Sequence, residues 1–332
     1  MRFEWEKLGK IFAPNSGGSW GTSHAQVPFT LKFEDRVRVY YSTRGPRDER
    51  GQFVSVPAYV DFSRENFPKK IGASSGPVLK CGLPGDFDHF GAMGGSIVRS
   101  ERGLVLYYCG WNRSVAVPYD WNIGTALGNP GGTEFTREDP GPLFGPTKTE
   151  PFLFACPVVF QFEGAWRMFY LGGTRWFKNA DGGFESQYLL KAATSVDGNT
   201  WERDGIPLLP TVVPDESQTS ATVIQIEHLF YLFFSYRFGE GFRESSAKGY
   251  RIGMAVSKDL RIWERHDADS GIDVSQEGWD SAMVAYPHLF SLDNQVYMLY
   301  CGNEFGSQGF GLAQLKTPLE GKSWRILSSF GD

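Results

Sequence analysis

Four acidic residues stand at nearly the same distance before a short apolar strand that ends in an aromatic residue. The distance from each acid to that aromatic residue is about 18 to 20 residues. The four acids are Asp88, Glu150, Glu216 and Asp280. Glycosidic bonds are cleaved by pairs of carboxyl groups, one of which protonates the leaving oxygen while the other acts as nucleophile or base. The spacing therefore predicts general acid–base chemistry, with these four residues as the catalytic candidates.

Polar and aromatic residues follow the same strands. Most of them come three residues after the terminal aromatic, and His24 is the nearest titratable group where the first strand lacks an acid. Aromatic faces stack on sugar rings, while arginine and amide groups bind hydroxyls and oxyanions. The predicted substrate-binding residues are His24, Arg44, Trp111, Arg175, Arg237 and Asn303.

These strands recur through the chain and predict its fold. The terminal aromatics are spaced about 62 to 67 residues apart, at Tyr41, Tyr108, Tyr170, Phe234 and Tyr300. Another apolar strand precedes each copy and further strands separated by tight turns follow it, with no sustained helical periodicity. Five units of four strands predict an all-β, five-bladed β-propeller with four-stranded antiparallel blades around a central axis.

The repeats also predict blade boundaries within a single domain, residues 1–332. The expected blades are approximately 20–80, 88–145, 150–210, 215–268 and 280–328. Residues 1–19 are expected to supply an outer strand that closes the ring, because Trp5–Pro14 resembles the outer strand at Trp201–Pro210. Two stacked β-sandwiches are the alternative fold, which five nearly equal periods disfavour.

The blade geometry turns sequence offsets into a site. In an antiparallel blade, residues before the first strand and after the second lie at the same edge. The four acids are therefore expected to gather at the mouth of one axial funnel. The alternative is structural: each acid caps a turn or pairs with an arginine.

Composition excludes several classes of protein. The chain has 332 residues, a net charge of −5 and 41% hydrophobic residues, so it is neither disordered nor suited to nucleic acid. No apolar run approaches the roughly 20 residues that span a bilayer, and the N-terminus lacks a secretory signal, which predicts a cytoplasmic protein. The four cysteines are scattered, without metal-site spacing, so no cofactor or transition metal is expected. A single Ca²⁺ or Na⁺ bound on the axis is an alternative that the sequence leaves open.

Several segments resemble a known superfamily. They are Trp20–Pro28, Phe87–Gly91, Tyr250–Ser257, Gly278–Ser281 and Gly302–Ala313. The chain resembles the five-bladed propeller superfamily that contains glycoside hydrolase families 32, 43, 68 and 130. It is most similar to an uncharacterised bacterial family 32-like branch linked with surface-polysaccharide gene clusters. The resemblance implies a carbohydrate or glycoconjugate substrate, with Glu150 as general acid and Asp88 as a stabilising carboxylate.

Two positions depart from the superfamily pattern. The first blade carries Ser23, His24, Ala25 and Gln26 where hydrolases of the superfamily have an Asp, and Ala282 stands where the branch is expected to have a Glu. The candidates for the general base are therefore Glu216, Asp280 and His24. Three functions follow as alternatives: glycoside hydrolysis, glycosyl transfer or phosphorolysis on the same scaffold, and sugar binding without catalysis.

Overall fold

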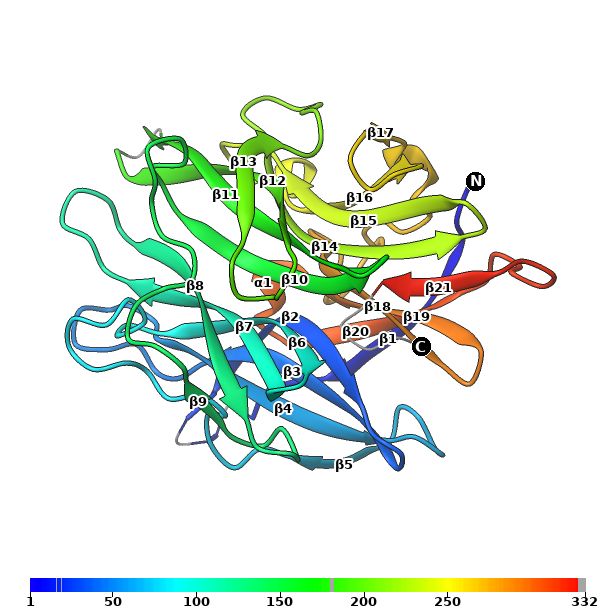
Figure 1. Cartoon of the computed structure of the whole chain (residues 1–332), viewed down its shortest axis with the longest axis horizontal. Coiled ribbons are helices and arrows are strands. Elements are labelled where there is room, and N and C mark those ends of the chain that lie inside the picture. The colour runs from blue at the N-terminus through cyan, green and yellow to red at the C-terminus, as the bar shows by residue number, and fades with distance from the viewer. Residues whose placement is uncertain (16, 19, 180–181, 328–332) are drawn as a thin grey trace.

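The computed structural model describes residues 1–15, 17–18, 20–179 and 182–327. Its strands form five separate antiparallel sheets, arranged as the blades of a propeller around one axis (Figure 1). The predicted five-bladed β-propeller is thus confirmed.

Three of the sheets consist only of consecutive strands, and the other two also contain a strand from one end of the chain. The first sheet contains β2 (Ser23–Lys32), β3 (Arg36–Arg44), β4 (Ser55–Ser63) and β5 (Lys70–Ala73). The second contains β6 (Ala92–Ser100), β7 (Gly103–Asn112), β8 (Asp120–Gly128) and β9 (Phe135–Arg137). The third contains β10 (Phe154–Phe162), β11 (Ala165–Lys178), β12 (Phe184–Ser195) and β13 (Glu202–Pro207). The fourth contains β14 (Ser217–Ile226), β15 (Leu229–Arg237), β16 (Arg251–Ser257) and β17 (Trp263–Arg265). The fifth contains β18 (Ala285–Leu292), β19 (Gln295–Cys301), β20 (Phe310–Leu315) and β1 (Trp5–Phe12).

Both ends of the chain join sheets that are distant from them in sequence. Strand β1 pairs antiparallel with β20, so the N-terminal segment supplies the outermost strand of the fifth sheet. Strand β21 (Trp324–Leu327) pairs with β14 and extends the fourth sheet. The expected fifth blade ran to residue 328, but in the structure its last consecutive strand is β20.

Helices are short. The structure has one α-helical turn, α1 (Asn303–Gly306), and two 3₁₀ turns, η1 (Ser246–Lys248) and η2 (Asp267–Asp269), within the described ranges. No helix in that part of the chain is long and apolar enough to cross a membrane.

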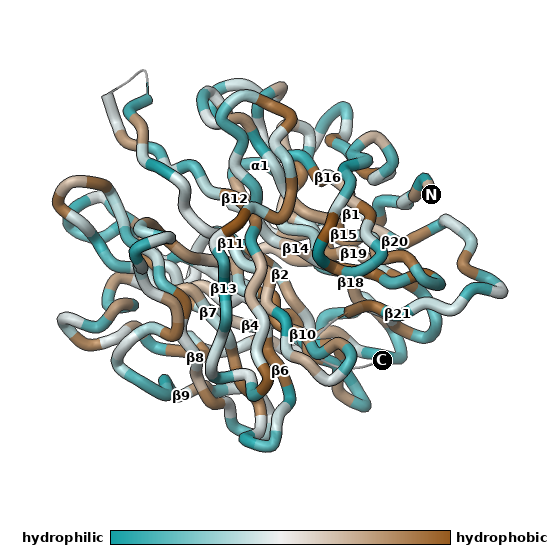
Figure 2. Tube along the Cα trace, turned by 45° about the horizontal axis from the view of Figure 1, so that its top comes forward, coloured by the Kyte–Doolittle hydropathy of each residue, from teal (hydrophilic) through white to brown (hydrophobic). Residues whose placement is uncertain are grey.

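The hydrophobic core lies between neighbouring sheets. One cluster combines Phe29 and Tyr40 of the first sheet with Leu106 and Phe135 of the second, and similar clusters fill the other interfaces. The inner strands are buried almost continuously, as in β3 and β15, which is expected where both faces of a sheet pack against neighbouring blades. Figure 2 shows the hydropathy of each residue along the strands. Each large side chain buried in this way contributes roughly 1.5–3 kcal/mol.

The first strand of each sheet lies at the axis and carries a bulge. Pairing shifts by one residue at Val27, Cys156, Ser220 and Tyr286, which have φ angles of 50°, 49°, 51° and 57°. Strand β6 shifts register between Gly94 and Ser96. A bulge twists its strand and redirects the following side chains. Positive φ is costly for a β-branched residue such as Val27, and such strain collects at functional positions.

Candidate functional site

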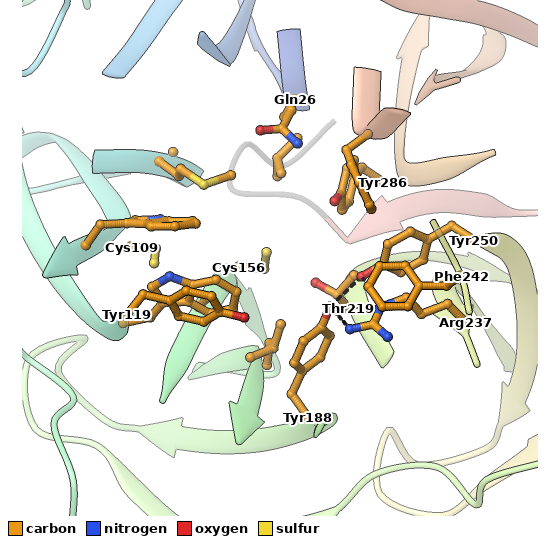
Figure 3. Close-up of a pocket in the computed structure, with 18 of the residues that line it drawn as sticks. Gln26, Cys109, Tyr119, Cys156, Tyr188, Thr219, Arg237, Phe242, Tyr250 and Tyr286 are labelled. Carbon is orange, nitrogen blue, oxygen red and sulfur yellow. Dashed lines mark hydrogen bonds between the residues drawn. The ribbon is translucent and has the colours of Figure 1, made fainter. Parts of the chain in front are cut away.

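A cavity of about 230 Å³ opens at the axis, and all five sheets contribute to its wall (Figure 3). Further along the axis the bulged strands leave a void of only about 20 Å³, so the cavity narrows sharply at that end. Its lining residues are Gln26, Val27, Arg44, Met93, Gly94, Cys109, Trp111, Tyr119, Trp121, Ala155, Cys156, Leu171, Glu185, Tyr188, Thr219, Arg237, Phe242, Arg243, Tyr250, Tyr286 and Phe305.

One wall of the cavity is aromatic. Trp111 on β7 pairs with Trp121 on β8, and their ring centroids are 4.8 Å apart. Tyr119 stacks on Trp121 at 4.4 Å with an interplanar angle of 6°. Both indole N–H groups are buried without a hydrogen-bond partner among the described residues. Because these N–H groups are closed off from solvent, this wall offers a sugar the flat faces of its rings.

The opposite wall is cationic. Figure 3 shows Arg237, Phe242 and Tyr250 across the cavity from Tyr119. Arg237 ends β15 and is only 2% exposed. Its guanidinium lies 3.6 Å from the ring centroid of Phe242 and donates to the Tyr188 hydroxyl at 3.2 Å. The structure thus holds a buried positive charge against neutral partners at the cavity.

A second arginine enters from the first sheet. Arg44 Nε donates to Ser55 Oγ at 3.2 Å, and its Nη1 lies 3.4 Å from His24 Nε2. Burial first, and then the charges of Arg44 and Arg47, lower the pKa of His24 to about 3. The imidazole is therefore neutral near pH 7 and accepts a hydrogen bond from Arg44. Burial also lowers the pKa of Arg44 to about 10, which leaves it charged.

One acid lies at the cavity rim. Glu185, near the start of β12, forms an ion pair with Arg243 from the loop between β15 and β16. Glu185 is the only carboxylate among the described residues that line the cavity. The cavity therefore does not present a pair of acids.

The four predicted acids lie elsewhere, inside their own sheets. Asp88, Glu150, Glu216 and Asp280 are between 0% and 3% exposed, and none of them lines the cavity. Each forms an ion pair with a base on the outermost strand of the same sheet. These pairs are Arg137–Asp88 at 2.7 Å, Arg203–Glu150 at 3.2 Å, Arg265–Glu216 at 2.6 Å and Lys7–Asp280 at 2.7 Å. We call each pair an acid staple.

The terminal aromatic of the second strand completes three of the staples. Tyr108 donates to Asp88 at 2.8 Å, Tyr170 donates to Glu150 at 2.9 Å, and Tyr300 donates to Asp280 at 3.1 Å. Burial, followed by the charge of Glu150, raises the pKa of Tyr170. The phenol therefore keeps its proton and acts as a donor. In the fourth sheet the terminal aromatic is Phe234, which has no hydroxyl to donate. Glu216 instead accepts from the backbone N–H groups of Val212 and Val213.

The first sheet lacks both members of the staple. In the other four sheets the base pairs across strands with an alanine, at Arg137–Ala126, Arg203–Ala193, Arg265–Ala255 and Lys7–Ala313. In the first sheet, Ala73 stands opposite Val60 at the position of the base, and Gly21 stands at the position of the acid. Each sheet has either both the acid and the base or neither of them, which indicates that each acid is there to neutralise its base.

The expectation that the four acids gather around one hollow is therefore wrong. Because their offsets are nearly equal, the acids lie at equivalent points of different blades. Each acid stands before the first strand of its sheet and forms an ion pair with the outermost strand of the same sheet. Their assignment as catalytic residues stays a prediction that these contacts do not support.

Only some of the six predicted binding residues line the cavity. Arg44, Trp111 and Arg237 line the cavity, and His24 supports Arg44 without lining it. Arg175 is exposed and pairs with Asp215. The Asn303 Oδ1 accepts from the backbone N–H of Ala282 at 2.7 Å and therefore stabilises a loop. Substrate binding by any of the six stays a prediction.

The lining residues missed by sequence reasoning come mainly from first strands, third strands and loops. Trp121 pairs with Trp111, and Tyr188 on β12 pairs with Gly173. Trp111 and Gly173 each come three residues after the terminal aromatic of their strand. Cross-strand register from the second strands would have found Trp121 and Tyr188, because paired residues share one end of the blade. No metal site is formed by the His, Cys, Asp and Glu residues of the described ranges.

Comparison with known sequences finds relatives over nearly the whole chain. No protein-family model matches it. It is 35% identical over 314 residues to the uncharacterized proteins MT1551 and Rv1502 of two Mycobacterium tuberculosis strains, covering 94% of this chain and 99% of each relative.

Solved structures match the whole fold at lower identity. A glycoside hydrolase matches with a TM-score of 0.71 and 17% identity, covering 96% of this chain and 92% of the other. A thermostable family-43 glycoside hydrolase matches with a TM-score of 0.62 and 15% identity, covering 90% of both chains. A protein of family GH130, described as mannoside phosphorylases that contain hydrolases targeting β-1,2 mannosidic linkages in Candida mannan, matches with a TM-score of 0.66 and 15% identity, covering 95% of this chain and 94% of the other. These likenesses show the fold that the chain shares with glycoside hydrolases.

Proposed function

This chain belongs to the family of the uncharacterized Mycobacterium tuberculosis proteins MT1551 and Rv1502, and we propose that it is a carbohydrate-active protein that binds its sugar in the axial cavity. The aromatic wall carries this proposal. Trp111 and Trp121 offer flat ring faces to a pocket that narrows sharply at one end. A sugar presents an apolar ring face, which packs on such a surface.

Glycosidic bond cleavage or transfer at this cavity would use Glu185 for proton transfer. General acid catalysis needs a carboxyl group within reach of the leaving oxygen, and Glu185 reaches the lining while the acid staples do not. Two carboxyl groups flanking the bond are required for hydrolysis by the usual route. The lining supports transfer or phosphorolysis at least as well, because a substrate hydroxyl or phosphate then replaces the water that a second carboxylate would activate.

The proposal is tested with a panel of glycans on the intact protein. Calorimetry should find a glycan whose binding is lost in Trp121→Ala, since stacking on this ring supplies much of the contact. Phe184→Ala is the matched control, because Phe184 lies on β12, is exposed and does not line the cavity. A glycan that binds Trp121→Ala as tightly as the unchanged protein would contradict the proposed site.

A cytoplasmic location stays a prediction from the sequence.

A further inference from the structure

The cavity carries a positive charge that the rest of the protein does not. Arg44, Arg237 and Arg243 line it together with one acid, Glu185, among the described residues, which gives a net charge of +2. The whole chain has a net charge of −5. Glu185 is already paired with Arg243, so the excess charge belongs to Arg44 and Arg237.

Elsewhere the fold neutralises its buried bases. Arg38 makes a double hydrogen bond to Asp61 at 2.8 and 2.7 Å, and the acid staples pair Arg137, Arg203 and Arg265 with carboxylates. Burying a charge without a counter-charge is costly, which explains this pattern. The two cavity arginines are therefore exceptions that require a reason.

Arg237 meets only neutral groups within the described ranges. Its Nη1 donates to the carbonyl oxygens of Phe238 at 2.8 Å and Gly239 at 3.3 Å, and its Nη2 donates to Tyr188. Burial first, and then the Tyr188 hydroxyl, raise the pKa of Tyr250, so this neighbouring phenol also stays uncharged. No carboxylate of the described chain forms an ion pair with Arg237, although it is 98% buried.

Arg44 is likewise left without an anion by its neighbours. His24 is neutral, Ser55 is a hydroxyl, and Arg47 adds a further positive charge nearby. Tyr250 and Tyr286 line the same cavity: their ring centroids are 5.7 Å apart, and the Tyr250 hydroxyl lies 3.4 Å from Arg237 Nε. The charges of Arg44 and Arg237 thus reach one cavity from the first and fourth sheets.

We propose that the sugar bound in the cavity is acidic, with its carboxylate or phosphate group held by Arg237 and Arg44 while its ring packs on Trp111 and Trp121. A guanidinium attracts both oxyanions by its charge and donates to them with the N–H groups that the described residues leave unpaired, on Nη2 of Arg237 and on Nη1 and Nη2 of Arg44. A neutral sugar would leave the excess charge of the cavity unmatched, whereas an acidic sugar supplies the counter-ion. This inference rests on the proposed function and names its substrate class.

Calorimetry on the intact protein tests the inference with matched ligands at one ionic strength. The probes are glucuronate, galacturonate, N-acetylneuraminate and glucose 6-phosphate, each set against glucose, galactose or inorganic phosphate. We expect at least one acidic sugar to bind at least 10-fold more tightly than its neutral partner and than phosphate alone. Neutral sugars that bind as tightly as all the acidic ones would overturn the inference and leave the proposed function standing.

Two further outcomes also decide. Inorganic phosphate that binds as tightly as glucose 6-phosphate would overturn the inference in favour of a free anion as co-substrate. No binding of any acidic probe would overturn it as well.

Variants then locate the anion. Arg44→Gln should remove about 10-fold of the acidic sugar's affinity and leave the affinity for a neutral sugar unchanged. Arg237→Lys, which keeps the charge but loses the fork, is the second variant if Arg44→Gln does not fold. Arg175→Gln is the control, because Arg175 pairs with Asp215 away from the lining. Equal losses for acidic and neutral sugars in both cavity variants would contradict the assigned role.

Discussion

Arg203 on the outermost strand of the third sheet lies 3.2 Å from Glu150, the acid that precedes the innermost strand of the same sheet. Lys191 on the intervening strand reaches the other carboxylate oxygen at 3.0 Å. One carboxylate thus joins both edges of a blade, and all three side chains are at most 13% exposed. Glu150 is therefore placed to stabilise the fold rather than to meet a ligand.

Neutralising Glu150 should destabilise the protein strongly. Glu150→Gln leaves Lys191 and Arg203 buried without a counter-charge, and breaking a buried ion pair costs about 3 to 5 kcal/mol. Denaturant unfolding should show this loss, while Glu202→Gln, an exposed change on the same strand as Arg203, should change the free energy of unfolding little. A Glu150→Gln protein of unchanged stability and abolished turnover would restore the catalytic assignment.

The staple of the fifth sheet should hold the ring closed. Lys7 on β1 lies 2.7 Å from Asp280, whose side chain is 4% exposed. Lys7→Met should therefore destabilise the protein and speed hydrogen exchange in β1, because Asp280 is left as a buried unpaired charge. Adding Asp280→Asn to Lys7→Met should recover part of the stability.

Lys10→Met provides the comparison on the same strand, since Lys10 is exposed. If the two changes at Lys7 and Asp280 add without coupling in a double-mutant cycle, the staple does not stabilise the closed ring.

Glu185 should affect turnover without affecting stability. Its partner Arg243 is half exposed, so Glu185→Gln should cost no more than about 1 kcal/mol of stability. If the proposed proton transfer is correct, turnover of a glycan substrate should fall at least about 100-fold. Unaltered turnover, measured with product detection by mass spectrometry, would remove Glu185 from the mechanism.

His24 should make the fold sensitive to acid. Its pKa is about 3 in the folded protein and 6.5 without burial. Between these values the unfolded chain binds more protons than the folded one, so stability falls as the pH drops from 6.5 towards 3. Above pH 6.5 the imidazole is neutral in both states and this contribution disappears.

Unfolding in urea at pH 7 and pH 4.5 measures the effect. His24→Gln should lose less stability than the unchanged protein on moving to pH 4.5. Arg44→Gln should raise the pKa of His24, as followed by NMR, because one of the charges that lower it is gone. Identical pH dependence in all three proteins would show that His24 is not held neutral.

The sequence was sufficient to predict the propeller. Five strands that end on the aromatics from Tyr41 to Tyr300 report the period directly, and the similarity of Trp5–Pro14 to an internal outer strand matches the place of β1 beside β20. The role of β21 was not predicted, because the repeat period assigns residues 280–328 to the fifth blade, whereas β21 pairs with β14 of the fourth sheet.

The site was less predictable because rotational repetition separates equivalent residues. The common offset of Asp88, Glu150 and Asp280 correctly identified them as equivalents, but equivalents occupy corresponding points of different blades. Their bases come from outer strands and carry no sign of the pairing in the local sequence. Only part of the cavity follows an offset: Arg44, Trp111 and Arg237 each come three residues after a terminal aromatic, whereas Trp121 and Tyr188 lie on third strands.

The central claim is that an acidic sugar occupies the axial cavity between Trp111, Trp121 and Arg237. A crystal structure of the protein soaked with the tightest acidic sugar tests it most directly. We predict density for the ring against the two indoles and for the oxyanion within hydrogen-bond distance of Arg237. Ligand density beside Glu150 or another staple, with the cavity empty, would contradict the claim.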